Sequence, residues 1–154
     1  MMLCLALSYF FGYYLSVMLH QPQTAALIGG LWAMISTVIV FDNNAQTLYE
    51  NIHIRMVGTF VGVCCACIIF YCLGLVFWTF LLAIFLTMML SLIFNLPAFR
   101  LACLSVSLIY VLSIVNPSTG VLTNGGLRFI ESVVGAWVPW VLGWPFRYWF
   151  KSHN

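Results

Sequence analysis

Long apolar runs, separated by short polar breaks, occupy almost the whole chain. The first two runs cover residues 2–19 and 24–41, and a polar cluster beginning at Asp42 ends the second. A helix needs about 20 apolar residues to cross a bilayer core, so both runs predict membrane-spanning helices. A signal peptide is the alternative for the first run, but no Lys or Arg precedes it and no Ala-x-Ala cleavage site follows it.

The middle of the chain has no charged residue from Met56 to Phe99. As one helix, this run would extend about 66 Å, roughly twice the ~30 Å of a bilayer core. We therefore expect it to fold back around Cys72–Gly74, where glycine permits a tight turn. The fold-back gives a third span at about 55–73, preceded by a short amphipathic segment at 47–55, and a fourth span at about 75–94.

Two further runs complete the pattern. A polar turn at 95–100, which contains Pro97, leads into a fifth span at about 98–115. A loop rich in turn-forming residues covers 116–126, a sixth span follows at about 127–146, and a basic aromatic tail ends the chain at 147–154. The pattern predicts an all-α, integral membrane six-helix bundle that forms a single transmembrane domain over residues 1–154.

Composition and charge favour the same class. Residues of the AVILMFWYC set make up 64% of the chain and charged residues only 5%, whereas a soluble domain has about 25% charged residues. The outer surface must therefore face the lipid bilayer. The formal net charge is +2 and no basic run is present, so no nucleic-acid partner is expected.

The positive charges also predict an orientation. With six spans, one side of the membrane would hold Arg55, Arg100, Arg147 and Lys151, and the other side only Arg128. Positively charged loops prefer the cytoplasm. Both termini are therefore expected to be cytoplasmic.

No catalytic or metal-binding pattern is present in the sequence. It has no Ser/His/Asp set, no HExxH, no glycine-rich phosphate loop and only three acidic residues. The six cysteines lie in apolar runs, and the spacing CCAC at 64–67 has no histidine nearby. Helical cysteines in lipid mostly act as small hydrophobic residues. We expect no enzyme activity, no metal, no cofactor and no disulfide.

A repeat relates the third and sixth spans. The third begins "RMVGTFVG" at Arg55 and the sixth begins "RFIESVVG" at Arg128, an offset of 73 positions (55 to 128). The same offset, without a gap, aligns Ala25 with Ala98 and Leu31 with Leu104. Repeat one would cover about 1–73 and repeat two about 74–146. Because each repeat has an odd number of spans, the two would be inverted in the membrane, as in many transporters.

The repeat places two arginines where an anion path would need them. Each arginine is predicted to open a helix, where unpaired backbone N–H groups and the helix dipole favour an anion. Thr59 and Ser132 follow four residues later on the same helix faces and are expected to be secondary contacts. Inversion would put Arg55 near the cytoplasmic face and Arg128 near the opposite face.

Three glycines and one carboxylate complete the predicted site. Gly58, Gly62 and Gly135 are expected helix-packing positions, because a missing side chain lets another helix approach closely. Glu131 stands three residues after Arg128 and can pair with it across the helix face, bracing or regulating it.

A second interpretation of the charged residues stays open. Arginines at helix ends often extend to lipid headgroups and merely anchor the span. This would explain Arg55 and Arg100 without any transported ion. Arg128 lies on the side where such charge is disfavoured, and its pair with Glu131 could instead hold two helices together.

Three segments of the sequence are distinctive: the motif Arg55-x-x-Gly58-Thr59-x-x-Gly62, its weaker echo "RFIESVVGAWV" and the segment "HQPQTAALIGGLWAMIST" at 20–37. Together they resemble the membrane domain of the fusaric acid resistance and aromatic acid exporter (FUSC-like) proteins. Plant malate channels have a similar six-span core. The resemblance covers nearly the whole chain. It implies an exporter or channel for small organic anions, aromatic or carboxylate, acting usually as a dimer in a bacterial inner membrane. Glu131 replaces the glycine of the motif, which would weaken a second anion site.

Two functions are therefore carried forward. The first is a membrane transport protein for small organic anions, working as a homo-oligomer because a chain of 154 residues encloses little volume. The second is a non-transporting membrane subunit or scaffold that packs against a larger partner, which the short loops and aromatic faces also suit.

Overall fold

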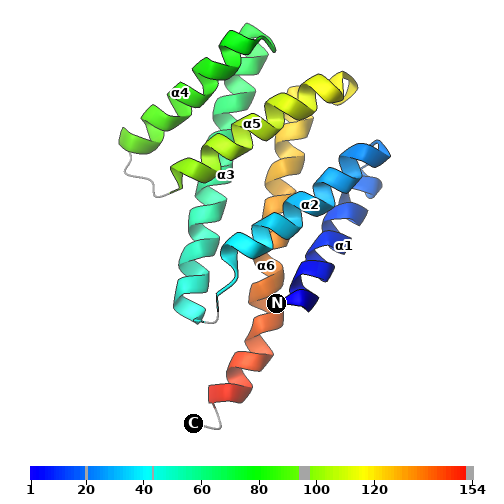
Figure 1. Ribbon diagram of the computed structural model, residues 1–154, viewed down its shortest axis with the longest axis vertical. Helices are drawn as coiled ribbons and strands as arrows, with labels where there is room; N and C mark the ends of the chain where they lie inside the picture. Colours follow the sequence, from blue (N-terminus) through cyan, green and yellow to red (C-terminus); the bar gives the residue numbers. More distant parts are fainter. Residues whose placement is uncertain (20, 43, 94–97, 152–154) are drawn as a thin grey trace. The chain divides into compact units, whose positions relative to one another are not determined.

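A computed structural model describes residues 1–19, 21–42, 44–93 and 98–151 (Figure 1). Its described part is all-α, as predicted, and contains no strand. The elements in chain order are α1 (Met2–Met18), α2 (Gln23–Val40), α3 (Ala45–Leu73), α4 (Phe77–Ile93), α5 (Phe99–Val115), the 3-10 helix η1 (Pro117–Thr119) and α6 (Val121–Lys151).

Four helices match their predicted spans within two residues: α1, α2, α4 and α5. The fold-back between α3 and α4 is confirmed as well, since α3 ends at Leu73 and Gly74 has a φ of +80°. Glycine adopts this left-handed conformation without steric cost. After the turn, the Val76 N–H donates to Thr79 Oγ1 over 3.0 Å and so caps the start of α4. Pro97 of the next predicted turn lies outside the described residues.

Two helices begin earlier than predicted. The segment 47–55 is not separate, because α3 starts at Ala45 and continues through it without a break. Likewise α6 starts at Val121, within the predicted loop, and continues to Lys151, through most of the predicted tail. The predicted bounds followed hydrophobicity, whereas a helix needs only backbone hydrogen bonds and can include polar turns. Arg55 and Arg128 therefore lie inside their helices, and the prediction that each opens a helix is wrong.

The apolar surface of the helices suits a membrane. Of the described residues, Gln23–Val40 and Gln46–Leu73 have the length and hydropathy to span a bilayer, and α1, α4 and α5 are apolar helices of 17 residues. Large apolar side chains such as Phe10, Trp78 and Phe85 are at least half exposed. A water-soluble protein rarely exposes so many such side chains together. The number of spans stays a prediction.

The helices pack as two compact units. The first unit comprises residues 1–55 and 131–154, and the second comprises residues 56–130. Both α3 and α6 continue from one unit into the other. The units thus differ from the predicted repeats, about 1–73 and 74–146. Each unit combines the first two helices of one repeat with most of the third helix of the other.

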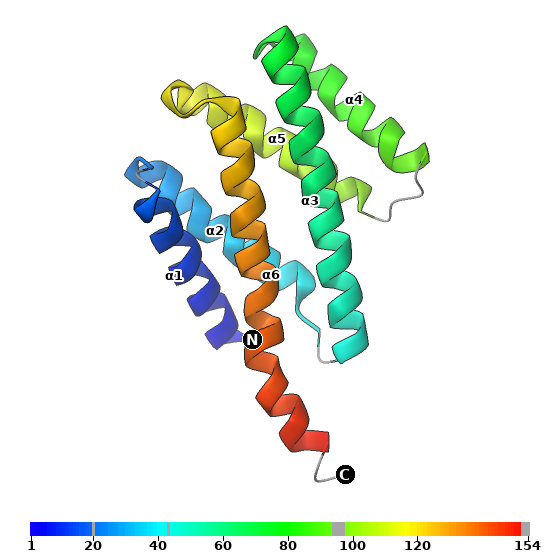
Figure 2. The same cartoon turned by 180° about the vertical axis from the view of Figure 1, so that it is seen from behind.

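In the first unit, α1 runs alongside α2 (Figures 1 and 2). Gly12 makes this close contact possible, because a Cβ atom added there would lie 2.7 Å from the Ala33 Cβ and 2.9 Å from the Gly29 carbonyl oxygen. A small apolar cluster joins α2, α3 and α6 through Val40, Leu48 and Ala136. These contacts bring α2 to the centre of the helices that carry the polar residues described below.

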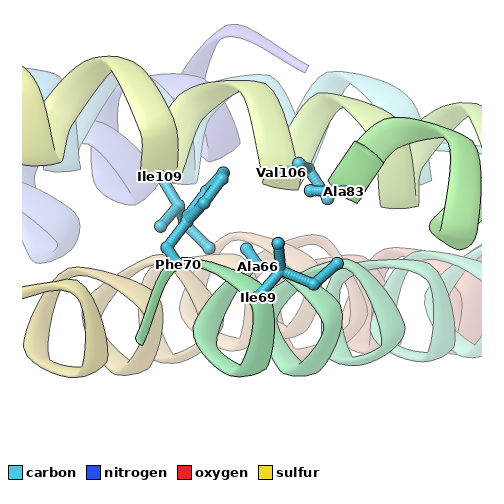
Figure 3. Packing of buried hydrophobic residues seen from close by; sticks show 6 residues of the cluster. All are labelled: Ala66, Ile69, Phe70, Ala83, Val106 and Ile109. Carbon is cyan, nitrogen blue, oxygen red and sulfur yellow. The ribbon is translucent and has the colours of Figure 1, made fainter. Parts of the chain in front are cut away.

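In the second unit, an apolar cluster holds α3, α4 and α5 together. Figure 3 shows Ala66, Ile69 and Phe70 of α3 facing Val106 and Ile109 of α5, with Ala83 of α4 beside them. The stacked rings of Phe80 and Tyr110 extend it, with centroids 4.4 Å apart. This cluster excludes water from the centre of the second unit.

Candidate functional site

Buried polar side chains of the first unit gather around α2. Burying a polar group away from water costs free energy unless the group has a hydrogen-bond partner. A cluster of buried polar side chains is therefore a candidate functional site. The members have no exposed surface and come from four helices: Ser8, Ser16, Ser36, Thr37, Arg55, Glu131 and Ser132.

Arg55 contacts two residues of α2, one of them a member of this cluster. Its guanidinium donates from Nη2 to Ser36 Oγ over 2.9 Å, and its Cζ lies 4.6 Å from the centroid of the Trp32 ring. Such cation–π contacts stabilise a cation most where water is excluded. The donors on Nε and Nη1 are also buried, and no hydrogen-bond acceptor for them lies among the described residues.

Burial also tests the anchoring interpretation of the arginines. Both Arg55 and Arg128 have a relative exposure of 0%. An arginine that extends to lipid headgroups keeps its charged end at the membrane surface. The anchoring interpretation is therefore wrong for Arg55, and for Arg128 the alternative of a pair with Glu131 that holds two helices together stays open. Arg100 is exposed and stacks its guanidinium over Phe99, 5.5 Å from the ring centroid, so it remains compatible with anchoring.

Trp32 links the arginine to α6. Its Nε1–H donates to Ser132 Oγ over 2.8 Å, while Arg55 lies over its ring. The indole is therefore fixed at its edge by a hydroxyl and carries the cation on its face. This combination orients Arg55 toward Ser36 on the next turn of α2.

We expect Trp32→Phe to lower the free energy of unfolding by about 1–2 kcal/mol, because Ser132 loses its indole donor while the ring face under Arg55 remains. Thermal unfolding can be followed with a thiol-reactive dye, since Cys4, Cys65 and Cys67 are free and buried. Ser132→Ala should cost little further stability in the Trp32→Phe background. A full additional loss would show that Ser132 acts through another contact.

Glu131 is held in the same unit by α1. Its Oε1 accepts a hydrogen bond from Ser16 Oγ over 2.7 Å. Gly29 on α2 makes the room for it, because a Cβ atom at this position would overlap both the Glu131 carboxylate and Ser16 Oγ. The carboxylate therefore occupies space that any other residue at position 29 would fill.

Four of the other predicted residues lie in the second unit. Gly58 packs against Ala98, with an added Cβ 2.8 Å from the Ala98 Cβ, and Gly62 contacts the Ala102 carbonyl group. Thr59 is fully buried, and its Oγ1 has no hydrogen-bond partner among the described residues. The structure thus divides the predicted site: Arg55, Glu131, Ser132 and Gly135 belong to the first unit, and Gly58, Thr59, Gly62 and Arg128 to the second.

Four residues of the cluster, and the tryptophan beside it, were missed by the sequence analysis: Ser8, Ser16, Ser36, Thr37 and Trp32. They stand within apolar runs, where a serine, threonine or tryptophan carries no specific signal. A weak signal exists in their spacing. Trp32 and Ser36 are four residues apart, and so lie on one face of a helix.

A protein-family model described as fusaric acid resistance protein-like matches residues 3–142. The chain belongs to this family. The resemblance proposed from the arginine–glycine motif is therefore confirmed, and the protein is a membrane protein of a family whose members act in transport. No curated protein and no solved structure matches the chain.

The packing of this fusaric acid resistance protein-like chain repeats between its units. In the first unit, an added Cβ at Gly135 would overlap the Ala33 carbonyl oxygen and lie 2.8 Å from the Ser36 Cβ. In the second unit, an added Cβ at Gly62 would overlap the Ala102 carbonyl oxygen and lie 2.9 Å from the Ser105 Cβ. Both serines bond back to their own helix: Ser36 to the Trp32 carbonyl (2.9 Å) and Ser105 to that of Leu101 (3.0 Å).

These contacts give a register for the repeat. The α3 and α6 glycines are 73 positions apart (62 to 135), as the sequence predicts, but the α2 and α5 residues are 69 apart (33 to 102 and 36 to 105). The ungapped pairing of Ala25 with Ala98 is therefore shifted by four residues, about one helical turn, so that Gly29 corresponds to Ala98. A shift of one turn preserves the helix face that packs, which is why the apolar sequence did not reveal it.

In this register, Arg55, Ser36 and Ser132 correspond to the polar residues Arg128, Ser105 and Thr59, but other polar residues of the first unit have apolar counterparts in the second. Trp32 corresponds to Leu101, Thr37 to Val106 and Glu131 to Gly58. On α1 and α4, Ser8 lies against Thr37 and Ala83 clusters with Val106, the counterpart of Thr37, so Ser8 corresponds to Ala83. Repeated small residues pack the helices in both units, whereas Trp32, Thr37, Glu131 and Ser8 are polar only in the first unit.

Proposed function

We propose that the protein moves small organic anions, aromatic or carboxylate, across a bacterial inner membrane, as an exporter or a channel. The observation that carries this proposal is the environment of Arg55. A fully buried guanidinium has a neutral hydroxyl and an aromatic face as its described partners, and two of its nitrogens have no acceptor among the described residues.

Electrostatics favours an anionic ligand at this place. An uncompensated charge inside a membrane protein costs several kcal/mol, and such residues mark ion or substrate pathways. A carboxylate can accept charge-assisted hydrogen bonds from the two remaining nitrogens and neutralise the arginine at once. The full burial of Arg55 means that the ligand enters when the first unit opens.

Other predicted residues take supporting parts in the proposal. Ser132 would be a secondary contact in the first unit, since its hydroxyl is fixed by Trp32. Arg128 would be a second attracting group, Thr59, one turn after Arg55 on α3, would be a secondary contact, and Glu131 would brace or regulate Arg128. Membership of the family supports a transport role. A homodimer, inverted repeats and cytoplasmic termini complete the proposal.

Flux into liposomes tests the proposal. Purified protein is reconstituted, and uptake of radiolabelled benzoate and of a labelled dicarboxylate is measured under an imposed gradient. We expect Arg55→Gln to lower flux by about tenfold or more, because the ligand loses charge-assisted hydrogen bonds. Arg100→Gln is the matched control. It removes the same charge from an exposed position and is expected to change flux less than twofold.

Two results would contradict the proposal. Equal flux in the wild type and in Arg55→Gln would remove Arg55 from the path. The absence of flux for every acid under every gradient, from protein that remains folded, would favour the scaffold. A comparison of folded fractions by thiol labelling separates these results from simple loss of structure.

A further inference from the structure

A proline inside α6 leaves one backbone carbonyl without its helical partner. In an α-helix, the carbonyl of residue 135 accepts from the N–H of residue 139. Residue 139 is Pro139, which is fully buried and has no N–H. The ring of a proline also crowds the carbonyl four residues earlier. Gly135, which has no side chain, is the residue that carries this carbonyl, so two helix-weakening residues act at the same turn.

A hydroxyl from α2 satisfies the released carbonyl. Thr37 Oγ1 lies 2.7 Å from the Gly135 oxygen. Within hydrogen-bond distance of the same Oγ1 are also the Ala33 carbonyl oxygen, at 3.2 Å on its own helix, and Ser8 Oγ, at 2.5 Å on α1. Thr37 and Ser8 are both fully buried. The compensation for Pro139 therefore comes from two neighbouring helices of the same unit.

The second unit has the equivalent positions without the proline and without the two hydroxyls. In the register established above, Pro139 corresponds to Ala66, Thr37 to Val106 and Ser8 to Ala83. Those three residues lie together in the apolar cluster of Figure 3. Ala66 retains its N–H, and neither Val106 nor Ala83 carries a hydroxyl. The proline and the two hydroxyls thus occur together in one unit and are replaced together in the other, which indicates that they act as a set.

We infer that Gly135–Pro139 is a hinge in α6 and that the Thr37 hydroxyl is its latch. A hydroxyl has one proton to donate, and Thr37 has two carbonyl acceptors for it. With the hinge latched, the proton goes to the Gly135 oxygen, which is the nearer. When α6 bends away, the same proton turns to the Ala33 oxygen, so Thr37 loses no hydrogen bond. Release then costs only the bond at Gly135.

The contacts also indicate which part of α6 moves. The turn before the hinge is held to α1 and α2, through Glu131 to Ser16 and through Ser132 to Trp32. The segment after Pro139, which begins with the exposed Trp140 and Val141 and continues to Lys151, is the moving part. The hinge therefore lies one turn beyond residues of the polar cluster, and its motion releases the contact of Thr37 with Gly135 while the contacts of Glu131 and Ser132 remain.

Hydrogen exchange of the intact protein in lipid nanodiscs, read by mass spectrometry, tests the hinge. In the wild type, the amides of residues 136–142 should exchange faster than those of residues 122–130 of the same helix. Thr37→Val should accelerate exchange at 136–142 by about tenfold. Pro139→Ala should slow it below the wild type, and Thr37→Val should then change it less than twofold. Thr87→Val, which removes a buried threonine hydroxyl from α4, is the matched control and should leave α6 unchanged.

Three results would overturn the inference. Uniform protection along wild-type α6 would mean that no hinge opens. An acceleration by Thr37→Val that spreads over all of the first unit would mean that Thr37 is a static packing residue. An equal acceleration in the Pro139→Ala background would mean that the hydroxyl does not act on the carbonyl released by the proline. The measurement needs no transported anion, so it succeeds or fails independently of the proposed function.

Discussion

Gly135→Ala is expected to lower the free energy of unfolding by about 3 kcal/mol, the upper end of the usual cost of overpacking. The added Cβ would overlap the Ala33 carbonyl oxygen and lie 2.8 Å from the Ser36 Cβ. The first atom belongs to the backbone of α2 and cannot move without displacing the helix. For a chain of this size, we expect the midpoint of thermal unfolding to fall by about 10 °C, measured by labelling of the buried thiols.

The same helix contains a matched control. An added Cβ at Gly126 would have no neighbour within 4 Å. Replacing a helical glycine by alanine stabilises by about 0.5–1 kcal/mol when nothing obstructs the new side chain. Gly126→Ala should therefore be neutral or slightly stabilising. If Gly135→Ala proved as stable as Gly126→Ala, the close contact between α2 and α6 would be contradicted.

Gly29→Ala is expected to be the second large loss, about 2 kcal/mol, for a different reason. Here the new Cβ would overlap two side-chain groups, the Glu131 carboxylate and Ser16 Oγ, rather than a backbone. Displacing them breaks the 2.7 Å hydrogen bond between them inside a buried site. The loss is again measured as a shift in thermal unfolding.

A double-mutant cycle isolates the cause. The second unit accommodates an alanine at the matching position, Ala98, because Gly58 faces it. In a Glu131→Gly background, Gly29→Ala should therefore cost less than about 0.5 kcal/mol, which gives a coupling energy of about 2 kcal/mol. Additive losses would show that Gly29 is required for some contact other than room for the carboxylate.

The two predictions concern different levels of the structure. Gly135 and its counterpart Gly62 allow helices to approach in both units, so they belong to the repeated scaffold. Gly29 makes room for a charged group that the second unit lacks at this position. Loss of the first should weaken folding, whereas loss of the second should disturb the polar cluster around Arg55. Measured together, the two variants distinguish the contacts that stabilise the fold from the contacts that form the polar cluster.

The sequence predicted the helices well where hydrophobicity and a turn residue agreed. α1, α2, α4 and α5 and the fold-back at Gly74 were all anticipated. It failed at the starts of α3 and α6, because polar residues there keep helical hydrogen bonds although they are not apolar. Because of this error, Arg55 and Arg128 were predicted at helix ends, where the helix dipole favours an anion. Their positions inside the helices do not support that role of the dipole.

By itself, then, the sequence determined the all-α class, the membrane environment, the family motif from Arg55 to Gly62 and the spacing of its echo. These depend on composition and local periodicity, which each segment carries alone. Only the tertiary structure decided that Arg55 contacts Trp32 and Ser36 and that Gly29 faces Glu131. It alone also showed that Thr37 donates to the carbonyl released by Pro139. Each of these contacts joins two different helices, and the crossing that brings the helices together is set by which small residues meet, a property of two segments at once.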